Sequence, residues 1–150
     1  MRVLLQLVTH GQVSVDGAAT GEIQRGFVAL VGITHTDTPE DAEFLARKTA
    51  QLRVFADDEG KMNRSLLDVE GEVLVISQFT LYADARKGRR PSFIDASRPD
   101  HAEPLVKHFA DCLMKEGVSK VAHGVFGATM LVQIYNDGPV TIWLDSPDFR

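Results

Sequence analysis

The stretch Gly26-Phe27-Val28-Ala29-Leu30-Val31-Gly32-Ile33 is an unbroken run of apolar residues. Such a run, without alternating polar positions, is typical of a strand that is buried on both faces of a sheet. The segment 72–82 contains a second run of this kind, Val73-Leu74-Val75-Ile76. Both runs therefore predict strands in the interior of the fold.

Two helices are predicted beside these strands. Thr38-Pro39-Glu40-Asp41 is typical of a helix start, because a hydroxyl cap precedes a proline and two acids in the first turn. This helix is expected to end near Arg53, and a second is expected over 99–116 with Gly117 as its cap. The apolar spacing predicts these core-facing residues: Ala42, Leu45, Thr49 and Leu52 in the first helix, and Ala102, Leu105, Phe109 and Cys112 in the second.

The remaining strands are predicted to be short, at 3–9, 12–16, 54–56, 128–135 and 140–144. We expect 3–9 to pair with 12–16, and the last two strands to flank a turn at 136–139. Strands follow strands at both ends of this order. The pattern indicates a single domain, 1–150, of mixed α/β or α+β class rather than a doubly wound nucleotide-binding fold.

The composition is that of one ordinary globular domain, with 150 residues, 25 % charged residues and a net charge of −5. The single cysteine, Cys112, excludes an internal disulfide and fits a reducing cytoplasm. No apolar run approaches the roughly 20 residues of a membrane span. Polar residues follow Met1 too soon for a signal peptide. A cytoplasmic protein is therefore expected.

The basic residues are unevenly distributed along the chain. Residues 1–85 carry a net charge of −6, whereas residues 86–150 carry +1. Between 86 and 98 a single acid, Asp95, opposes five cations, which are Arg86, Lys87, Arg89, Arg90 and Arg98. A basic loop on an acidic body favours contact with one anion or one nucleic-acid end over a long duplex. The alternative is a solvated loop without a partner.

The familiar catalytic and metal motifs are absent from the sequence. It contains no glycine-rich dinucleotide fingerprint, P-loop, HExxH or G-x-S-x-G pattern. The five histidines lack the close spacing of metal ligands. Cys112 falls on the apolar side of a predicted helix, as expected of a buried core thiol. We therefore expect no metal and no cofactor.

Two short motifs remain that have a chemical interpretation besides a structural one. Ser77-Gln78-Phe79-Thr80 ends an apolar strand, where it forms either a simple turn or a set of N–H and hydroxyl groups around a substrate carbonyl. Gly138-Pro139 fits a hairpin turn. An X-Pro bond can also be cis, which would aim adjacent carbonyls in one direction as a rigid pair that rejects a ligand sterically.

Together these motifs closely resemble the D-aminoacyl-tRNA deacylase family. Ser77-Gln78-Phe79-Thr80-Leu81 resembles the family's first signature, and Asn136-Asp137-Gly138-Pro139-Val140-Thr141 resembles its second, in which the glycine–proline bond is cis. Further matching segments are Val13-Ser14-Val15, Thr20-Gly21-Glu22-Ile23, Gly60-Lys61-Met62-Asn63, Arg90-Pro91-Ser92-Phe93 and Phe126-Gly127-Ala128. The resemblance implies predominantly antiparallel and mixed β-sheets, partly barrel-like, with two main helices packed on them.

The resemblance implies a homodimeric hydrolase that cleaves the ester between a D-amino acid and the 3′ acceptor end of tRNA. Gly138 and Pro139 of one subunit would enter the active site of the other and exclude L-amino acids, whereas D-residues and achiral glycine would fit. The implied partners are a second copy of the chain and tRNA, with no DNA, no membrane and no cofactor.

Carried over by position, the reaction centre would consist of Ser77, Gln78, Phe79 and Thr80. The N–H groups of Phe79 and Thr80 would bind the developing oxyanion. Thr80 is either a nucleophile or a positioning residue, and we favour positioning, with the 2′-hydroxyl of the terminal adenosine assisting, because neither motif has a histidine beside it. The further implied contacts are Phe126 and Met130 with the adenosine, and Arg86, Lys87, Arg89 and Arg90 with tRNA phosphates.

The chain departs from the family pattern at a few positions. Leu7 and His10 stand where family members usually carry arginine, and Leu131 stands where glutamine is frequent. We expect these changes to affect rate and geometry before activity. Three other functions stay open: a related deacylase with a trans glycine–proline bond that clears an L-amino acid, a non-catalytic module for RNA ends, and a hydrolase of small esters.

Overall fold

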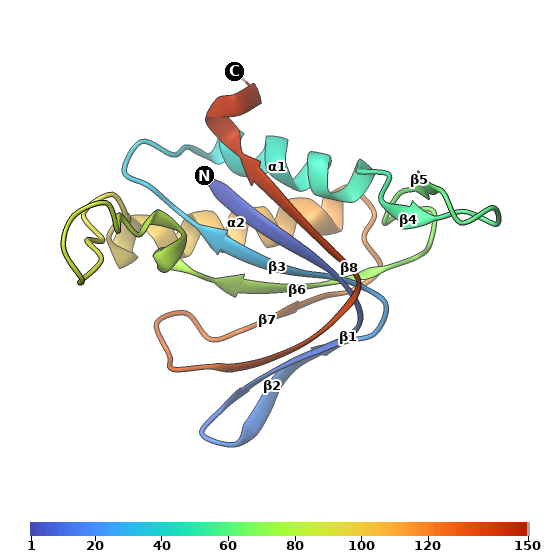
Figure 1. Cartoon of the computed structure of the whole chain (residues 1–150), viewed down its shortest axis with the longest axis horizontal. Helices are drawn as coiled ribbons and strands as arrows, with labels where there is room; N and C mark the ends of the chain where they lie inside the picture. Colours follow the sequence, from blue (N-terminus) through green and yellow to red (C-terminus); the bar gives the residue numbers. More distant parts are fainter. Residues whose placement is uncertain (150) are drawn as a thin grey trace.

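The structure is a computed structural model that describes residues 1–149, and it contains a curled sheet with two helices against one face (Figure 1). The elements along the chain are β1 (Arg2–Val15), β2 (Ala18–Ile23), β3 (Gly26–Gly32), α1 (Pro39–Gln51), β4 (Phe55–Ala56), β5 (Met62–Arg64), β6 (Glu72–Ser77), the 3-10 helix η1 (Phe79–Tyr82), α2 (Pro99–Lys115), β7 (Val121–His123), β8 (Leu131–Asp145) and the 3-10 helix η2 (Ser146–Phe149). The predicted fold class, mixed α/β with two main helices, is confirmed.

The main sheet has the strand order β2-β1-β3-β6-β7, and β8 pairs with β1. β1 is antiparallel to β2, β3 and β8, whereas β3, β6 and β7 are parallel to one another. The sheet curls until its two ends approach: a Cβ placed on Gly21 of β2 would lie 2.6 Å from the carbonyl oxygen of His123 in β7. The sheet is therefore mixed and partly barrel-like, as expected.

β3 and β6 are the buried strands that the two apolar runs predicted. Phe27, Ala29 and Val31 of β3 pack into the core that also contains the buried faces of the helices. Val28 of β3 and Leu74 of β6 belong to a second core on the other face of the sheet. A strand between two cores has no face for polar side chains, and this explains the unbroken apolar sequence.

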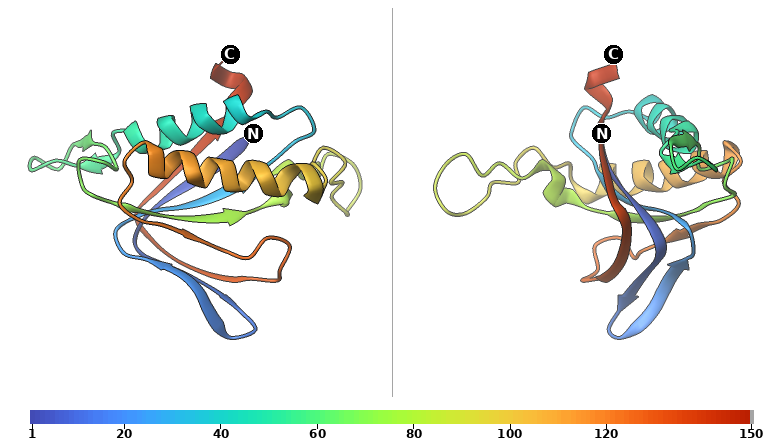
Figure 2. Two further views of the ribbon diagram at one scale, coloured as in Figure 1. Left: turned by 180° about the vertical axis from the view of Figure 1, so that it is seen from behind. Right: turned by 45° about the vertical axis from the view of Figure 1, so that its right-hand side comes forward.

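The two helices lie side by side on the same face of the sheet (Figure 2). α1 begins where the sequence predicted, and the N–H of Thr38 donates to Oδ2 of Asp41 at 2.9 Å. The predicted core-facing residues of both helices are buried, except Leu52, which follows the end of α1 and is half-buried. Within residues 1–149, no helix is long and apolar enough to cross a membrane.

The prediction that 3–9 pairs with 12–16 is wrong, because both segments belong to the single long strand β1. The first half of β1 pairs with β3 and the second half with β2, while β8 runs along the other edge of both halves. Gly11 in the middle is buried, and a Cβ there would lie 2.8 Å from Cγ2 of Val28. This glycine therefore allows close packing inside the sheet and does not form a turn.

The hairpin turn predicted at 136–139 is also wrong, because β8 continues through these residues as a bulged strand. Gln6 of β1 pairs with Thr141, and Val8 pairs with Asn136, so residues 137–140 of β8 lie opposite Leu7 alone. The side-chain amide of Asn136 lies 3.1 Å from Oγ1 of Thr141 and closes the bulge across its base. The chain keeps its direction because β1 offers a continuous partner on both sides of the bulge.

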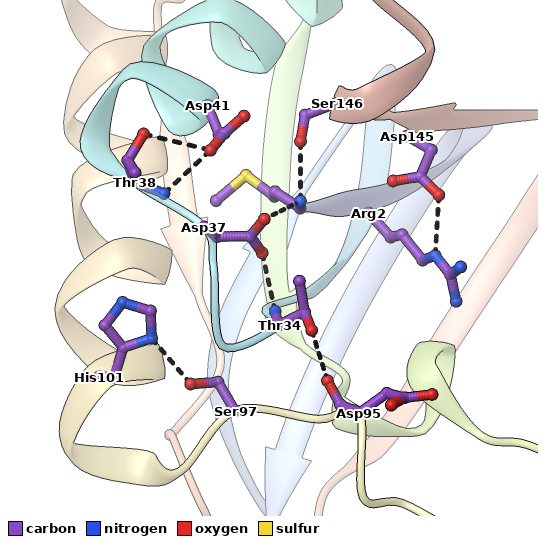
Figure 3. Close-up of polar contacts among 11 residues, drawn as sticks. Arg2, Thr34, Asp37, Thr38, Asp41, Asp95, Ser97, His101, Asp145 and Ser146 are labelled. Carbon is purple, nitrogen blue, oxygen red and sulfur yellow. Dashed lines mark hydrogen bonds and ion pairs between the residues drawn. The ribbon is translucent and has the colours of Figure 1, made fainter.

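A buried polar network anchors the start of β1 (Figure 3). The α-amino group of Met1 contacts the carboxylate of Asp37 and donates to Oγ of Ser146 at 2.8 Å. Asp37 also accepts from the N–H of Thr34 at 2.7 Å, and the Thr34 hydroxyl donates to the carbonyl of Asp95 at 2.6 Å. The network joins the start of β1, the segment before α1, η2 and the segment before α2.

Candidate functional site

A pocket of about 580 Å³ opens where β3 and β6 end, beside the start of α2. Neighbouring parallel strands end at the same edge of a sheet, so the segments that follow them meet there. The wall of the pocket is mostly apolar, and the polar side chains among its lining residues are those of Ser77, Gln78, Ser97 and Arg98. A pocket of this size and character is typical of a site for a small molecule or for one end of a larger one.

Three of the four predicted reaction-centre residues line this pocket, namely Ser77, Gln78 and Phe79. The fourth, Thr80, lies in η1 directly after them and is exposed. The side-chain amide of Gln78 donates to the hydroxyl of Thr80, and the N–H of Gln78 donates to the carbonyl of Val31 at 2.7 Å. Gln78 therefore forms hydrogen bonds both to the end of β3 and to the Thr80 hydroxyl at the edge of the pocket.

The backbone at the start of η1 has two N–H groups without a partner inside the turn. The first hydrogen bond of the turn runs from the N–H of Leu81 to the carbonyl of Gln78, at 3.3 Å. A 3-10 helix pairs each N–H with the carbonyl three residues earlier, so the N–H groups of Phe79 and Thr80 have no acceptor inside the turn. They can therefore donate to a group bound at the mouth of the pocket.

Arg2 holds η1 in place from the start of β1. Its Nη1 donates to the carbonyl of Leu81 at 2.9 Å, and its Nε donates to Oδ2 of Asp145 at 3.0 Å. The guanidinium lies 4.3 Å from the ring centroid of Tyr82. Burial raises the pKa of the Tyr82 phenol, and the nearby carboxylate of Asp37 adds to this shift. The position of η1 thus depends on β1 and β8 as well as on β6.

The two residues predicted to contact the adenosine, Phe126 and Met130, both lie in the pocket wall. They come from the segment between β7 and β8. The Met130 sulfur lies so close to Gly124 that a Cβ on this glycine would be 2.6 Å away from it. The absence of a side chain at Gly124 therefore allows Met130 to turn toward the sheet and the pocket.

Sequence reasoning missed the contribution of the segment before α2 and of the first turn of α2 to the pocket. Phe93, Ser97 and Ala102 line the pocket, and the Phe93 ring meets Phe79 with 5.1 Å between centroids. Ser97 Oγ lies 2.7 Å from Nδ1 of His101 (Figure 3). The proline at the start of α2 and the small inward residue Ala102 are visible in the sequence, but they do not show that this helix start faces the end of β6.

The structure also places a histidine near the first motif, which local sequence did not predict. A second hollow of about 310 Å³ adjoins the pocket and shares Ser77, Val106 and Phe126 with it. His123, Glu103 and Lys107 belong to its lining residues. Ser77 therefore lies between an apolar pocket and a hollow that contains titratable side chains.

The basic residues of 86–90 lie on a loop that projects from the body of the fold (Figure 2). Lys87, Arg89 and Arg90 are exposed. Arg86 instead donates to Asp84, with Nε 2.8 Å from Oδ1 and Nη2 2.7 Å from Oδ2. This pairing lowers the pKa of Asp84 to about 2. Arg86 thus has a partner within the loop, and none of these four cations lines the pocket.

Gly138 and Pro139 do not line the pocket of their own chain. They form the exposed tip of the β8 bulge, and the peptide bond between them is cis, as the family resemblance implied. The same strand carries three large exposed side chains, Leu131, Tyr135 and Trp143. β8 therefore presents an apolar outer surface with the Gly138-Pro139 tip beside it.

Comparison with known proteins gives consistent matches. The family model described as D-Tyr-tRNA(Tyr) deacylase matches residues 4–145. A D-aminoacyl-tRNA deacylase of Thermomicrobium roseum is 59 % identical over 150 residues, which cover 100 % of this chain and 97 % of the relative. One of Thermus aquaticus is 56 % identical over 148 residues, which cover 99 % and 97 %.

Two solved structures are similar to this fold. A structure titled c-Myc DNA unwinding element binding protein has a TM-score of 0.90 and 40 % identity, covering 98 % of this chain and 99 % of that one. A probable eukaryotic D-amino acid tRNA deacylase has a TM-score of 0.81 and 19 % identity, covering 95 % and 97 %. At this lower identity the likeness shows the fold alone.

Proposed function

The chain belongs to the D-Tyr-tRNA(Tyr) deacylase family, and from this premise we propose that its pocket at the end of β6 hydrolyses the ester of D-aminoacyl-tRNA. The products are a free D-amino acid and tRNA, so the reaction removes D-residues before translation uses them. The observation that carries the proposal is the convergence of Ser77, Gln78 and Phe79 with Phe126 and Met130 on one pocket.

The proposed chemistry relies on positioning and on backbone dipoles. The N–H groups of Phe79 and Thr80 stabilise the oxyanion that forms when the ester carbonyl is attacked. The 2′-hydroxyl of the terminal adenosine assists the attack, and Thr80 positions the substrate. The hydrogen bond from Gln78 to the Thr80 hydroxyl supports a positioning role, because this hydroxyl already has a fixed partner.

The apolar part of the pocket receives the terminal adenosine in this proposal. Phe126 and Met130 pack against the base, and Phe79 and Phe93 offer aromatic edges at the mouth. A base with a polarisable face gains from stacking on aromatic side chains, and this contact does not depend on the amino acid attached. The same pocket can therefore serve tRNAs that carry different D-residues.

Discrimination against L-amino acids comes from a second copy of the chain. In a homodimer the Gly138-Pro139 tip of one subunit enters the pocket of the other and occupies the space that an L side chain needs. The exposed position of the tip and the apolar side chains of Leu131, Tyr135 and Trp143 support this arrangement. Glycine has no side chain to exclude, so glycyl-tRNA is a further expected substrate.

The tRNA acceptor stem passes the projecting basic loop in this proposal. Lys87, Arg89 and Arg90 contact phosphates with no regard to sequence, which suits an enzyme that serves many tRNAs. Arg86 contributes less net charge because of its pairing with Asp84. No DNA, membrane or cofactor takes part, and the reaction belongs in the cytoplasm, where aminoacyl-tRNA is used.

The decisive test compares hydrolysis of D-Tyr-tRNA and L-Tyr-tRNA by the purified protein. Release of D-tyrosine with L-Tyr-tRNA spared is expected. Release of neither amino acid despite tRNA binding would favour a binding module, and release of both would favour a deacylase that clears an L-amino acid. Phe126→Ala should raise KM, whereas Val125→Ala, which changes an exposed neighbour outside the pocket, should not.

A second candidate is a hydrolase of small esters, which the contact between Ser97 and His101 favours. A serine hydroxyl 2.7 Å from a histidine nitrogen at a pocket wall is the geometry of a nucleophile and its base. Hydrolysis of p-nitrophenyl acetate that disappears in Ser97→Ala would support it. Loss of D-Tyr-tRNA hydrolysis in the same variant would instead mean that Ser97 acts in the deacylase reaction.

A further inference from the structure

A cluster of three potential metal ligands lies between the two helices, among residues that do not line the pocket. Glu43 comes from α1, and His108 and Cys112 lie one turn apart on α2. Oε1 of Glu43 is 3.2 Å from Nε2 of His108, and Sγ of Cys112 is 3.6 Å from the same nitrogen. Among the described residues, this is the one group of His, Cys and acidic side chains whose ligand atoms all lie within 4.8 Å of one another.

These distances match the edges of a tetrahedral zinc site. Zinc binds histidine nitrogen at about 2.0–2.1 Å, carboxylate oxygen at about 2.0–2.2 Å and thiolate sulfur at about 2.3 Å. At tetrahedral angles these lengths separate nitrogen from oxygen by about 3.4 Å and nitrogen from sulfur by about 3.6 Å. The observed separations are 3.2 Å and 3.6 Å, so the two edges that meet at His108 already fit. The third edge, between the Glu43 carboxylate and the Cys112 sulfur, is at most 4.8 Å long and closes when both atoms bind one ion.

The hydrogen-bond chemistry of the cluster also favours a cation. Both Glu43 and Cys112 approach the same nitrogen of His108, and that nitrogen carries either one proton or one lone pair. If Nε2 of His108 carries the proton, it donates to the Glu43 carboxylate, and the Cys112 thiol has no acceptor there. If Nε2 carries no proton, it accepts from the thiol, and its lone pair faces the negatively charged carboxylate. An ion between the three atoms satisfies all of them together.

We propose that Glu43, His108 and Cys112 bind one zinc-like divalent cation, with water in the remaining coordination position. The thiol proton leaves to solvent when the thiolate binds. Imidazole and thiolate favour zinc over the hard cation magnesium. The ion reaches the site from the Glu43 side, where the carboxylate is about half exposed and the His108 ring is 30 % exposed.

The bound ion would connect α1 to α2. α2 is the helix that contributes Ala102 and Val106 to the pocket wall. Its role is therefore to stabilise the helix layer and not to take part in ester hydrolysis. The histidine spacing that argued against metal binding could not reveal it, because Glu43 lies in a different helix, 65 positions from His108.

The test titrates metal-free full-length protein with Co²⁺ and Zn²⁺. Thiolate ligation of Co²⁺ produces a sulfur-to-metal charge-transfer band, which stoichiometric Zn²⁺ should remove and Mg²⁺ should not. We expect one ion per chain and a rise in Tm with Zn²⁺. Glu43→Gln and His108→Gln should each weaken Zn²⁺ binding about tenfold or more, and Cys112→Ser should abolish the band.

Asp100→Asn is the matched control, because it removes an exposed carboxylate of α2 that pairs with Arg98 outside the cluster. It should bind Co²⁺ and Zn²⁺ as the unchanged protein does. Glu43→Gln and His108→Gln change partly exposed side chains, so both should fold even if Cys112→Ser does not. Absence of the Co²⁺ band, or equal Zn²⁺ affinity in the unchanged protein and His108→Gln, would overturn the proposal whether or not the protein hydrolyses aminoacyl-tRNA.

Discussion

The Phe79 ring meets the Phe93 ring edge-on, with centroids 5.1 Å apart and planes inclined by 71°. Phe79 begins η1, and Phe93 lies where the chain returns from the basic loop toward α2. The contact therefore closes the base of the loop against the mouth of the pocket. It connects the surface proposed to contact tRNA with the residues proposed to act on its ester.

Phe93→Ala should therefore weaken catalysis without unfolding the protein. An edge-on aromatic pair contributes about 0.5–1.5 kcal/mol to holding Phe79 in place. Without Phe93, substrate binding must supply this energy to order Phe79, so kcat/KM for D-Tyr-tRNA should fall by up to about 12-fold. Ile94→Ala is the control, because the neighbouring side chain is 81 % exposed and does not line the pocket. Equal kcat/KM values for the two variants would show that Phe93 does not contribute to the site.

The basic loop should divide into two functional groups. Joint replacement of Lys87, Arg89 and Arg90 by alanine should raise KM for aminoacyl-tRNA and lower the dependence of log KM on log salt by about 2–3. Arg86→Ala alone should change KM less than any of those three does singly, because Asp84 already offsets its charge. KM values measured at several salt concentrations test both expectations. Arg47→Ala is the control, because it removes an exposed cation of α1 away from the loop.

The pairing of Asp84 with Arg86 also predicts a pH dependence. Hydrogen bonds from Arg86 lower the folded-state pKa of Asp84 to about 2 from its usual 3.8. A lowered pKa means that the pairing stabilises the loop fully above pH 3.8 and is lost as the pH falls through about 2. Arg86→Ala should return the Asp84 carboxyl titration, followed by NMR, toward 3.8. The titration of Asp111, whose pKa is lowered by Lys107, should not move.

Much of the fold could be predicted from local sequence, and the errors have a common cause. The runs around Val28 and Val75 required buried strands whatever their neighbours, and Thr38 with Pro39 specified a helix start by local chemistry alone. Asn136 to Pro139, in contrast, suit a reversal or a bulge equally well. Whether these residues form a reversal or a bulge depends on whether β1 continues past Leu7 as a pairing partner. This depends on tertiary structure and cannot be read from residues 136–139 themselves.

The same reasoning explains what could be predicted of the site. Ser77, Gln78 and Phe79 are contiguous, so one motif revealed them together. Phe93 and Ser97 reach the pocket only because α2 packs beside the end of β6. Phe93 falls in a segment that matches the family, but nothing local places it in the pocket, and a serine near a helix start is ordinary.

The anchor at the start of β1 gives a prediction about stability. The α-amino group of Met1 and the carboxylate of Asp37 are almost fully buried against each other. Asp37→Asn removes one charge and leaves the other without its partner, which should lower the free energy of unfolding by about 3–5 kcal/mol. Urea denaturation measures this. Asp58→Asn, at an exposed ion pair with Arg64, should change stability by less than about 1 kcal/mol, and a similar loss in both variants would contradict the assigned role.

Gly138→Ala tests the proposed exclusion of L-amino acids. Gly138 has φ +121°, and a Cβ there would lie 2.8 Å from Cγ2 of Val140, so alanine must displace the tip of the bulge. We expect the ratio of kcat/KM for D-Tyr-tRNA over L-Tyr-tRNA to fall. Gly17→Ala is the control, because Gly17 has φ +81° but no atom within 4 Å of the added Cβ. It also places a side chain on a residue with positive φ, without disturbing the tip.

Mixed dimers then test which subunit of the proposed homodimer supplies the tip. A Gly138→Ala chain is paired with a Gln78→Ala chain, whose own pocket is disabled but whose tip is unchanged. If the tip acts on the partner, the one working pocket receives an intact tip, and discrimination between D- and L-Tyr-tRNA returns. If the tip acts within its own chain, the working pocket keeps the altered tip and discrimination stays low. The second result would contradict exclusion by the partner subunit while leaving the hydrolase activity itself in place.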